Sequence, residues 1–68
     1  MPRNLLSLAQ QFGGQFTMPG RLRFIITNES RLKTVKDCAA HIGARATVTN
    51  EKNIGGTRYV VLSVTYAN

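Results

Sequence analysis

The ten residues 57–66 constrain the fold of this chain more than any other segment. Side chains of an extended strand alternate between its two faces, and here both faces carry apolar residues. One face holds Val60, Leu62, Val64 and Tyr66, and the other holds Tyr59, Val61, Ser63 and Thr65. A strand with apolar residues on both faces is typical of the middle of a sheet. We therefore expect residues 57–66 to form a central strand around which the rest of the chain is arranged.

Two other segments show the spacing of amphipathic helices, residues 2–12 and residues 29–42. Their apolar stripes are Leu5, Leu8, Ala9 and Phe12 in the first and Leu32, Val35, Ala39 and Ile42, flanked by Cys38, in the second. Asn4 and Asn28 are suitable N-caps for the two helices. We expect the second and longer helix to be a packing element.

Two further strands and a hairpin loop complete the pattern. Residues 21–27 and 45–50 alternate as half-buried strands do. Residues 51–56 suit a hairpin loop, because they end in a glycine pair that readily adopts positive φ. Residues 15–20 are interpreted as connecting chain, or as a short extended piece turned at Pro19-Gly20.

The resulting order, α-β-α-β-β, predicts a small α+β fold. A right-handed β-α-β crossover followed by a hairpin places the first two strands parallel, with the last strand between them and antiparallel to both. We therefore expect one domain over residues 1–68, since 68 residues suit a single domain. Its sheet is predicted to be three-stranded and mixed, with the C-terminal strand central, its two neighbours as edges and the long helix packed on one face. The N-terminal helix is expected on the other face or at an edge.

The charge of the chain points to an acidic partner. Nine Lys and Arg residues stand against three Asp and Glu residues, which gives a net charge of +6. Such a balance favours nucleic acid, a nucleoprotein particle or an acidic protein surface as the partner. A basic surface that is merely solvated is the alternative interpretation.

The sheet face opposite the long helix is the candidate binding surface. Alternation collects basic, hydroxyl and aromatic residues there, and these types suit single-stranded nucleic acid because Arg contacts phosphate and Tyr stacks on a base. The basic residues of the expected hairpin loop can add to this surface. The candidate site residues are Arg21, Arg23, Arg45, Lys52, Arg58 and Tyr59.

One observation weakens this assignment, and two alternative arrangements compete with it. The two aromatic-rich strand motifs of the RNA-recognition fold are absent from the sequence. The helix over residues 2–12 can cover the same face, with Ile25 and Val61 as its seat. Alternatively, two chains can pair through this face as a homodimer, which would help a domain too small to bury a large core.

Catalytic, metal and cofactor sites are not expected. Cys38 is the single cysteine, which excludes an internal disulfide. His41 lies one helical turn after Asp37, but no nucleophile accompanies the pair, and a surface histidine near a helix C-terminus is the simpler interpretation. The three carboxylates are too few and too scattered for an acid-base pair or a metal site.

The sequence therefore predicts a non-catalytic binding protein. We expect it to bind nucleic acid or a nucleoprotein complex through the basic sheet face and the hairpin. The alternative is a phage-type small protein that binds and inhibits or modulates a host protein complex. No apolar run is long enough for a membrane span, and we expect the protein in the cytoplasm, or in the host cytoplasm if it is viral.

Overall fold

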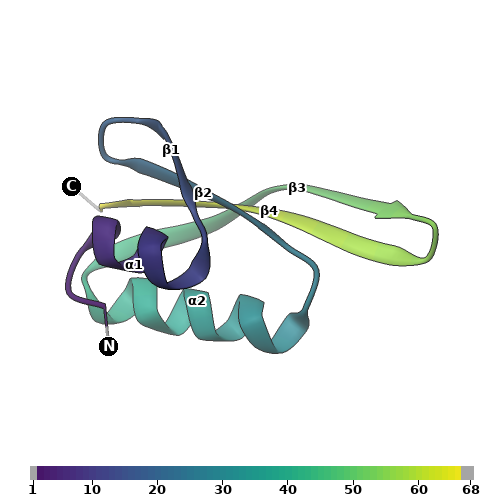
Figure 1. The fold of residues 1–68 in the computed structure, drawn as a ribbon, viewed down its shortest axis with the longest axis horizontal. Coiled ribbons are helices and arrows are strands. Elements are labelled where there is room, and N and C mark those ends of the chain that lie inside the picture. The colour runs from purple at the N-terminus through teal and green to yellow at the C-terminus, as the bar shows by residue number, and fades with distance from the viewer. Residues whose placement is uncertain (1, 67–68) are drawn as a thin grey trace.

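Two helices and four strands make up residues 2–66, the part of the chain that the computed structural model describes. In chain order they are α1 (Leu5–Phe12), β1 (Gln15–Met18), β2 (Arg21–Ile26), α2 (Glu29–His41), β3 (Ala44–Ile54) and β4 (Thr57–Tyr66). The strands form one sheet in the order β1-β2-β4-β3, and each hydrogen-bonded pair is antiparallel. Figure 1 shows both helices on the same side of this sheet. The fold is therefore a two-layer α+β arrangement.

The predicted α+β class and the central position of β4 are confirmed, but the predicted three-stranded mixed sheet is wrong. Strands β2 and β3 do run parallel to one another. As predicted, β4 lies between them and pairs antiparallel with both. Because β2 and β3 are not neighbours, no parallel ladder forms within the described residues.

A fourth strand, β1, is the second difference from the prediction, and it means that β2 is not an edge strand. In β1, Phe16 pairs with Leu22 of β2. The two strands are joined at Pro19 and Gly20, where φ of Gly20 is 81°, and this combination is typical of a type II turn. Of the two interpretations of residues 15–20, the short extended piece turned at Pro19-Gly20 is therefore the correct one. Residues 15–18 alternate polar and apolar side chains as a strand does, although all four are exposed.

Helix α1 lies beside α2, so its predicted place on the opposite face or at an edge is wrong. The predicted cap is confirmed, because Asn4 Oδ1 accepts a hydrogen bond from the Ser7 amide at 2.9 Å. Arg31 of α2 donates to the Phe12 carbonyl at 3.2 Å, and its guanidinium lies 5.8 Å from the centre of the Phe12 ring. The buried stripe of α1 joins the core shared with α2. Packing both stripes against one sheet face makes one continuous core instead of two thin ones.

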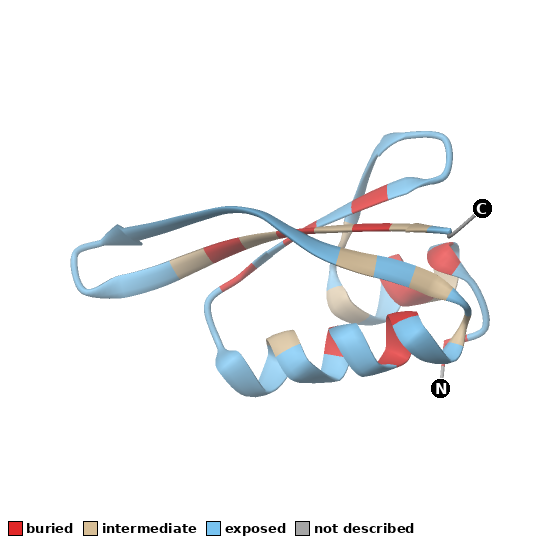
Figure 2. Ribbon diagram, turned by 180° about the vertical axis from the view of Figure 1, so that it is seen from behind, coloured by how far each residue is buried: buried red, intermediate tan, exposed pale blue. Residues whose placement is uncertain are grey.

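The core lies between the sheet and the two helices, where Figure 2 shows most of the buried residues. Its largest fully buried side chains are Leu8, Leu22, Val35, Leu62 and Val64. Helix α2 begins as predicted, since Asn28 Oδ1 accepts hydrogen bonds from the amides of Ser30 at 2.8 Å and Arg31 at 3.3 Å. Of its predicted stripe, Val35 and Ala39 are buried, whereas Leu32 and Ile42 are only partly so.

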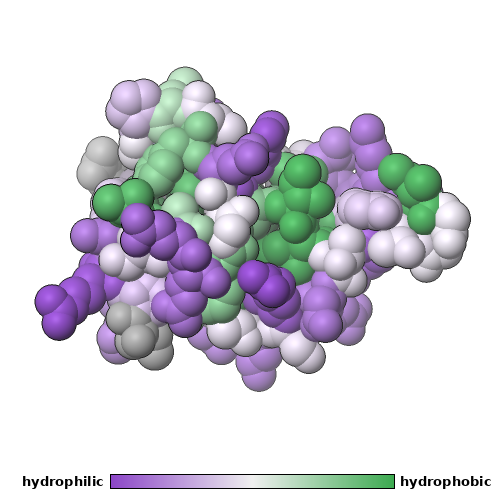
Figure 3. Space-filling model, viewed as in Figure 1, coloured by the Kyte–Doolittle hydropathy of each residue, from purple (hydrophilic) through white to green (hydrophobic). Residues whose placement is uncertain are grey.

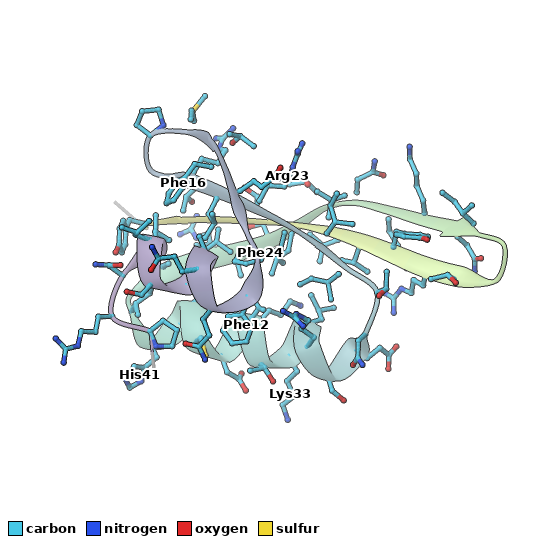
Figure 4. All side chains as sticks on the ribbon, viewed as in Figure 1. Phe12, Phe16, Arg23, Phe24, Lys33 and His41 are labelled. Carbon is cyan, nitrogen blue, oxygen red and sulfur yellow. The ribbon has the colours of Figure 1, made fainter. Side chains whose placement is uncertain are left out.

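The chain between α1 and β1 passes very close to this core. A Cβ placed on Gly14 would lie 2.6 Å from Cε1 of Phe24, a distance at which one of the two groups would have to move. Phe24 points from β2 toward the helices (Figure 4). Gly14 is therefore required for packing, although the sequence suggested only the end of a helix.

The β3–β4 hairpin projects beyond the helices, as Figure 1 shows. The predicted loop over residues 51–56 is too long, because β3 continues to Ile54 and only Gly55 and Gly56 form the turn. Both have positive φ, 58° and 84°, as a type I′ turn requires. Val48, expected inside, is 41% exposed on the edge strand β3. Neither helix of residues 2–66 is long and apolar enough to span a lipid bilayer.

Candidate functional site

The face of the sheet that carries no helix is accessible along its length, and we call it the open face. Side chains alternate along β2, so Arg23 points away from the helices while its neighbour Phe24 points toward them (Figure 4). In β4 the buried residues Val60, Leu62 and Val64 likewise alternate with Val61 and others on the open face. The alternative in which α1 covers this face is therefore wrong.

Cross-strand pairing arranges most of the open face in four rows, which we call rungs, and a fifth pair, Ile54 and Thr57, adjoins the β3–β4 turn. The first rung contains Met18, Arg21, Thr65 and Arg45, and the second contains Gln15, Arg23, Ser63 and Thr47. The third contains Ile25, Val61 and Asn50, and the fourth contains Tyr59 and Lys52. Five of the six predicted site residues are thus brought to one face. The charged rungs lie at one end, and the aromatic rung lies on the projecting hairpin.

A β-bulge decides which residues of the hairpin reach this face. The register of β3 against β4 shifts between Val48 and Asn50, so one extra residue of β3 is accommodated there. After the shift Lys52 stands opposite Tyr59, on the open face, and Glu51 stands opposite Val60, on the helix side. Without the bulge the faces of these two charged residues would be exchanged.

The cations of the open face have no partners within residues 2–66. No ion pair or side-chain hydrogen bond engages Arg21, Arg23, Arg45 or Lys52. None of the three Asp and Glu residues shares their face: Glu29 and Asp37 belong to α2, and Glu51 faces the helix side. The open face therefore presents four positive side chains and no side-chain carboxylate.

Two of these cations line a shallow hollow of about 260 Å³. Its lining consists of Thr17, Arg21, Arg23, Thr49 and Ser63, which supply two guanidinium groups and three hydroxyls. The Thr49 hydroxyl donates to the Val61 carbonyl at 3.4 Å, which leaves the two guanidinium groups and the hydroxyls of Thr17 and Ser63 as donors for a ligand. Such a set suits a phosphate group, because guanidinium pairs with phosphate through two parallel hydrogen bonds and hydroxyls complete the shell.

Arg58 is the predicted site residue that the structure does not bring to the open face. Its Nη1 donates to Glu29 Oε1 at 3.1 Å, and its Nε donates to Glu51 Oε1 in a second, shorter ion pair. Hydrogen bonding from Arg58 holds the pKa of Glu51 below its ordinary value, and the same bond raises the pKa of Arg58. Arg58 thus links the hairpin to the first turn of α2. With Ile26, Leu32 and Val60 it lines a small cavity of about 90 Å³ under the hairpin.

An apolar and an aromatic residue occupy the hairpin half of the open face. Ile25 is 64% exposed, although both neighbouring residues of β2 are buried. Tyr59, two residues along β4 from Val61, is half-buried. These side chains offer a surface on which planar, apolar groups can lie, next to the unpaired ammonium group of Lys52.

Sequence reasoning missed three contributors to the site, Thr17, Gln15 and Asn50. The first two reach the open face because β1 joins the sheet, and the third because of the bulge. The Pro19-Gly20 turn was a usable signal for the β1–β2 hairpin. The bulge has no comparable signal in the sequence.

The remaining candidates lie on α2, away from the open face. Lys33 and His41 project from the side of α2 that is remote from the sheet (Figure 4), and Cys38 is buried. No group of three or more His, Cys, Asp or Glu residues that could hold a metal ion occurs between residues 2 and 66.

The chain was compared with known proteins in three ways. No protein-family model, no curated protein and no solved structure matches it.

Proposed function

We propose that the protein binds nucleic acid through the open face of the sheet. The observation that carries this proposal is the set of four unpaired cations on a face without any side-chain carboxylate. Neutralising phosphates with Lys and Arg releases condensed counterions, and this release supplies most of the affinity in sequence-independent binding. The hollow between Arg21 and Arg23 provides the guanidinium and hydroxyl donors that a phosphate accepts, and Tyr59 provides a ring for a base.

The face can be used without rearrangement of the protein. Its cations are not held in internal ion pairs, so none has to be broken when a phosphate arrives. The proposed surface consists of Arg21, Arg23, Arg45, Lys52 and Tyr59, and it leaves out Arg58, whose guanidinium is already engaged by two carboxylates.

Fluorescence anisotropy with labelled single- and double-stranded DNA and RNA, between about 50 and 200 mM salt, tests the proposal. We expect Arg23→Ala to weaken binding to all sequences and to reduce the slope of log K against log salt by about one. Lys33→Ala is the matched control, because it removes the same charge from the far side of α2, and it should leave the slope nearly unchanged. Equal effects of the two variants, or no binding at low salt, would reject the proposal.

Docking on a protein complex is the second candidate, and a different part of the surface favours it. Leu6, Phe16 and Met18 are 57%, 45% and 53% exposed, and Figure 3 shows apolar atoms gathered over the β1–β2 hairpin. Exposed apolar patches often mark protein interfaces. If this surface is the functional one, Phe16→Ala should abolish binding to the protein partner, measured by affinity capture, while Arg23→Ala leaves that binding intact.

A further inference from the structure

We infer that the ligand of the open face is a single strand of about four nucleotides that lies lengthwise along β4, with one nucleotide at each rung. This inference rests on the proposed function and adds the class of nucleic acid, its length and its direction across the sheet. It comes from the order of the four rungs: three of the four cations lie on the first two, and Ile25, Val61 and Tyr59 lie on the last two.

The spacing of the rungs fits an extended strand. Successive rungs are two residues apart along β4, which corresponds to about 6.8 Å in an antiparallel sheet. The rise per nucleotide of a stacked strand in a duplex is only about 3.4 Å. A strand that advances one nucleotide per rung is therefore unstacked, and its bases are free to turn toward the protein.

The first two rungs suit phosphates. Arg21 and Arg45 flank Thr65 across the central strand, so their guanidinium groups can hold a phosphate from both sides. Arg23 and Ser63 follow on the next rung, and both line the hollow. A strand along β4 meets two cations on the first rung and one on the second.

The last two rungs suit bases, and this distinguishes a single strand from a duplex. Ile25 and Val61 form an apolar rung in the middle of a basic face, and Tyr59 follows it with an aromatic ring. A duplex would present charged phosphates and sugars to these residues, because its base faces are covered by stacking. A splayed single strand presents base faces instead, while Lys52 and Asn50 on the neighbouring strand β3 remain available to its phosphates.

The length of the site can be measured with oligothymidylates of about two to eight nucleotides, since sites of this kind span about 4–16 nucleotides. We expect affinity to rise steeply to about four nucleotides and then only slightly, as additional registers become available. A duplex of the same sequence and length should bind more weakly. If affinity instead rises by the same factor with each added phosphate up to eight nucleotides, or the duplex binds as well as the single strand, the inference is overturned while the proposed function stands.

Tyr59 supplies a second and independent readout. The chain has no tryptophan and two tyrosines, so a Tyr66→Phe variant reports on Tyr59 alone. We expect a four-nucleotide strand to quench its fluorescence. In binding assays Tyr59→Phe should retain affinity, whereas Tyr59→Leu should lose about 5- to 150-fold, the equivalent of one base–aromatic stack.

The outcomes of the two experiments separate the claims. If the strand binds without quenching Tyr59, and Tyr59→Leu binds as tightly as Tyr59→Phe, then Tyr59 does not stack on a base and the inference is overturned. Phosphate binding by the arginines is not affected by that result. If no strand or duplex of any length binds at low salt, the proposed function itself is rejected.

Discussion

The helix-covered face and the open face of the sheet are made from the same strands, yet they differ in burial, charge and freedom to vary. On the helix-covered face, three residues of β2 and three of β4 are apolar and almost completely buried: Leu22, Phe24, Ile26, Val60, Leu62 and Val64. On the other face the same strands carry Arg21, Arg23 and Ser63, which are exposed or half-buried. In a domain this small the core has little stability to spare, so the helix-covered face is fixed by packing. The open face contributes little to the core, and its residues can therefore serve binding.

The two sides of the molecule also differ in how their charges are balanced. On the helix side Arg58 is neutralised by Glu29 and Glu51. The open face carries four of the nine Lys and Arg residues and no side-chain carboxylate, whereas the rest of the chain carries the other five together with all three carboxylates, so two thirds of the net charge of +6 lies on the open face. A charge that is concentrated in this way produces a local field that attracts anions more effectively than the same charge spread over the surface.

The strongest test of this contrast is a pair of neighbouring substitutions in β4. Leu62→Ala removes a fully buried side chain and should lower the free energy of unfolding by about 2–5 kcal/mol, because it loses transfer energy and leaves a cavity. Ser63→Ala, on the open face, should change it by no more than about 0.5 kcal/mol. Urea denaturation measures both, and similar losses for the two variants would contradict the assignment of the faces.

A second test enlarges the core instead of reducing it. Gly14→Ala places a methyl group against the ring of Phe24 and should destabilise the fold by about 1–3 kcal/mol, as overpacking does. The control is the double variant with Phe24→Leu, in which the smaller side chain relieves the clash. The two substitutions should then be non-additive in a double-mutant cycle of unfolding free energies, and strict additivity would show that the two residues do not meet.

A third test compares two guanidinium groups of equal charge on opposite faces. If the open face binds nucleic acid as proposed, Arg21→Gln should reduce the slope of log K against log salt by about one, because it would remove one cation that neutralises a phosphate. Arg58→Gln should leave that slope unchanged, because its side chain is directed to the helix side. Anisotropy titrations at several salt concentrations measure both. A larger effect from Arg58→Gln would indicate that the binding surface lies at the N-terminal end of α2 instead.

The smallest expected effect concerns the acid limb of stability. The lowered pKa of Glu51 means that its charged form is favoured in the folded state, so its stabilising contribution is present above the ordinary glutamate pKa of about 4.3 and is lost as pH falls through the lowered value. As pH falls below about 4.3, the melting temperature of Glu51→Gln should therefore decrease less steeply than that of the parent protein. Asp37→Asn, on the exposed side of α2, is the control. Indistinguishable acid limbs in Glu51→Gln and the parent protein would show that the ion pair is not formed in solution.

Much of this fold could be predicted because it depends on local patterns. The caps at Asn4 and Asn28, the buried stripes of both helices and the central strand β4 all follow from the residues themselves. The grouping of the candidate site residues was predictable to the same extent, since alternation alone places Arg21, Arg23 and Tyr59 with the other residues of one face. The position of α1 was not predictable, because an apolar stripe specifies that a surface is buried but not which partner buries it.

The sequence by itself determined which residues of β2 and β4 are buried, since strand alternation has a period of two and tolerates no shift within an uninterrupted strand. The tertiary structure decided everything that depends on contacts between distant segments: the pairing of β1, the packing of α1 beside α2 and the face on which Lys52 lies. The last of these depends on one extra residue at the bulge of β3, because a single-residue shift moves all later side chains to the other face. The open face is left uncovered because both helices pack into one shared core on the opposite face of the sheet.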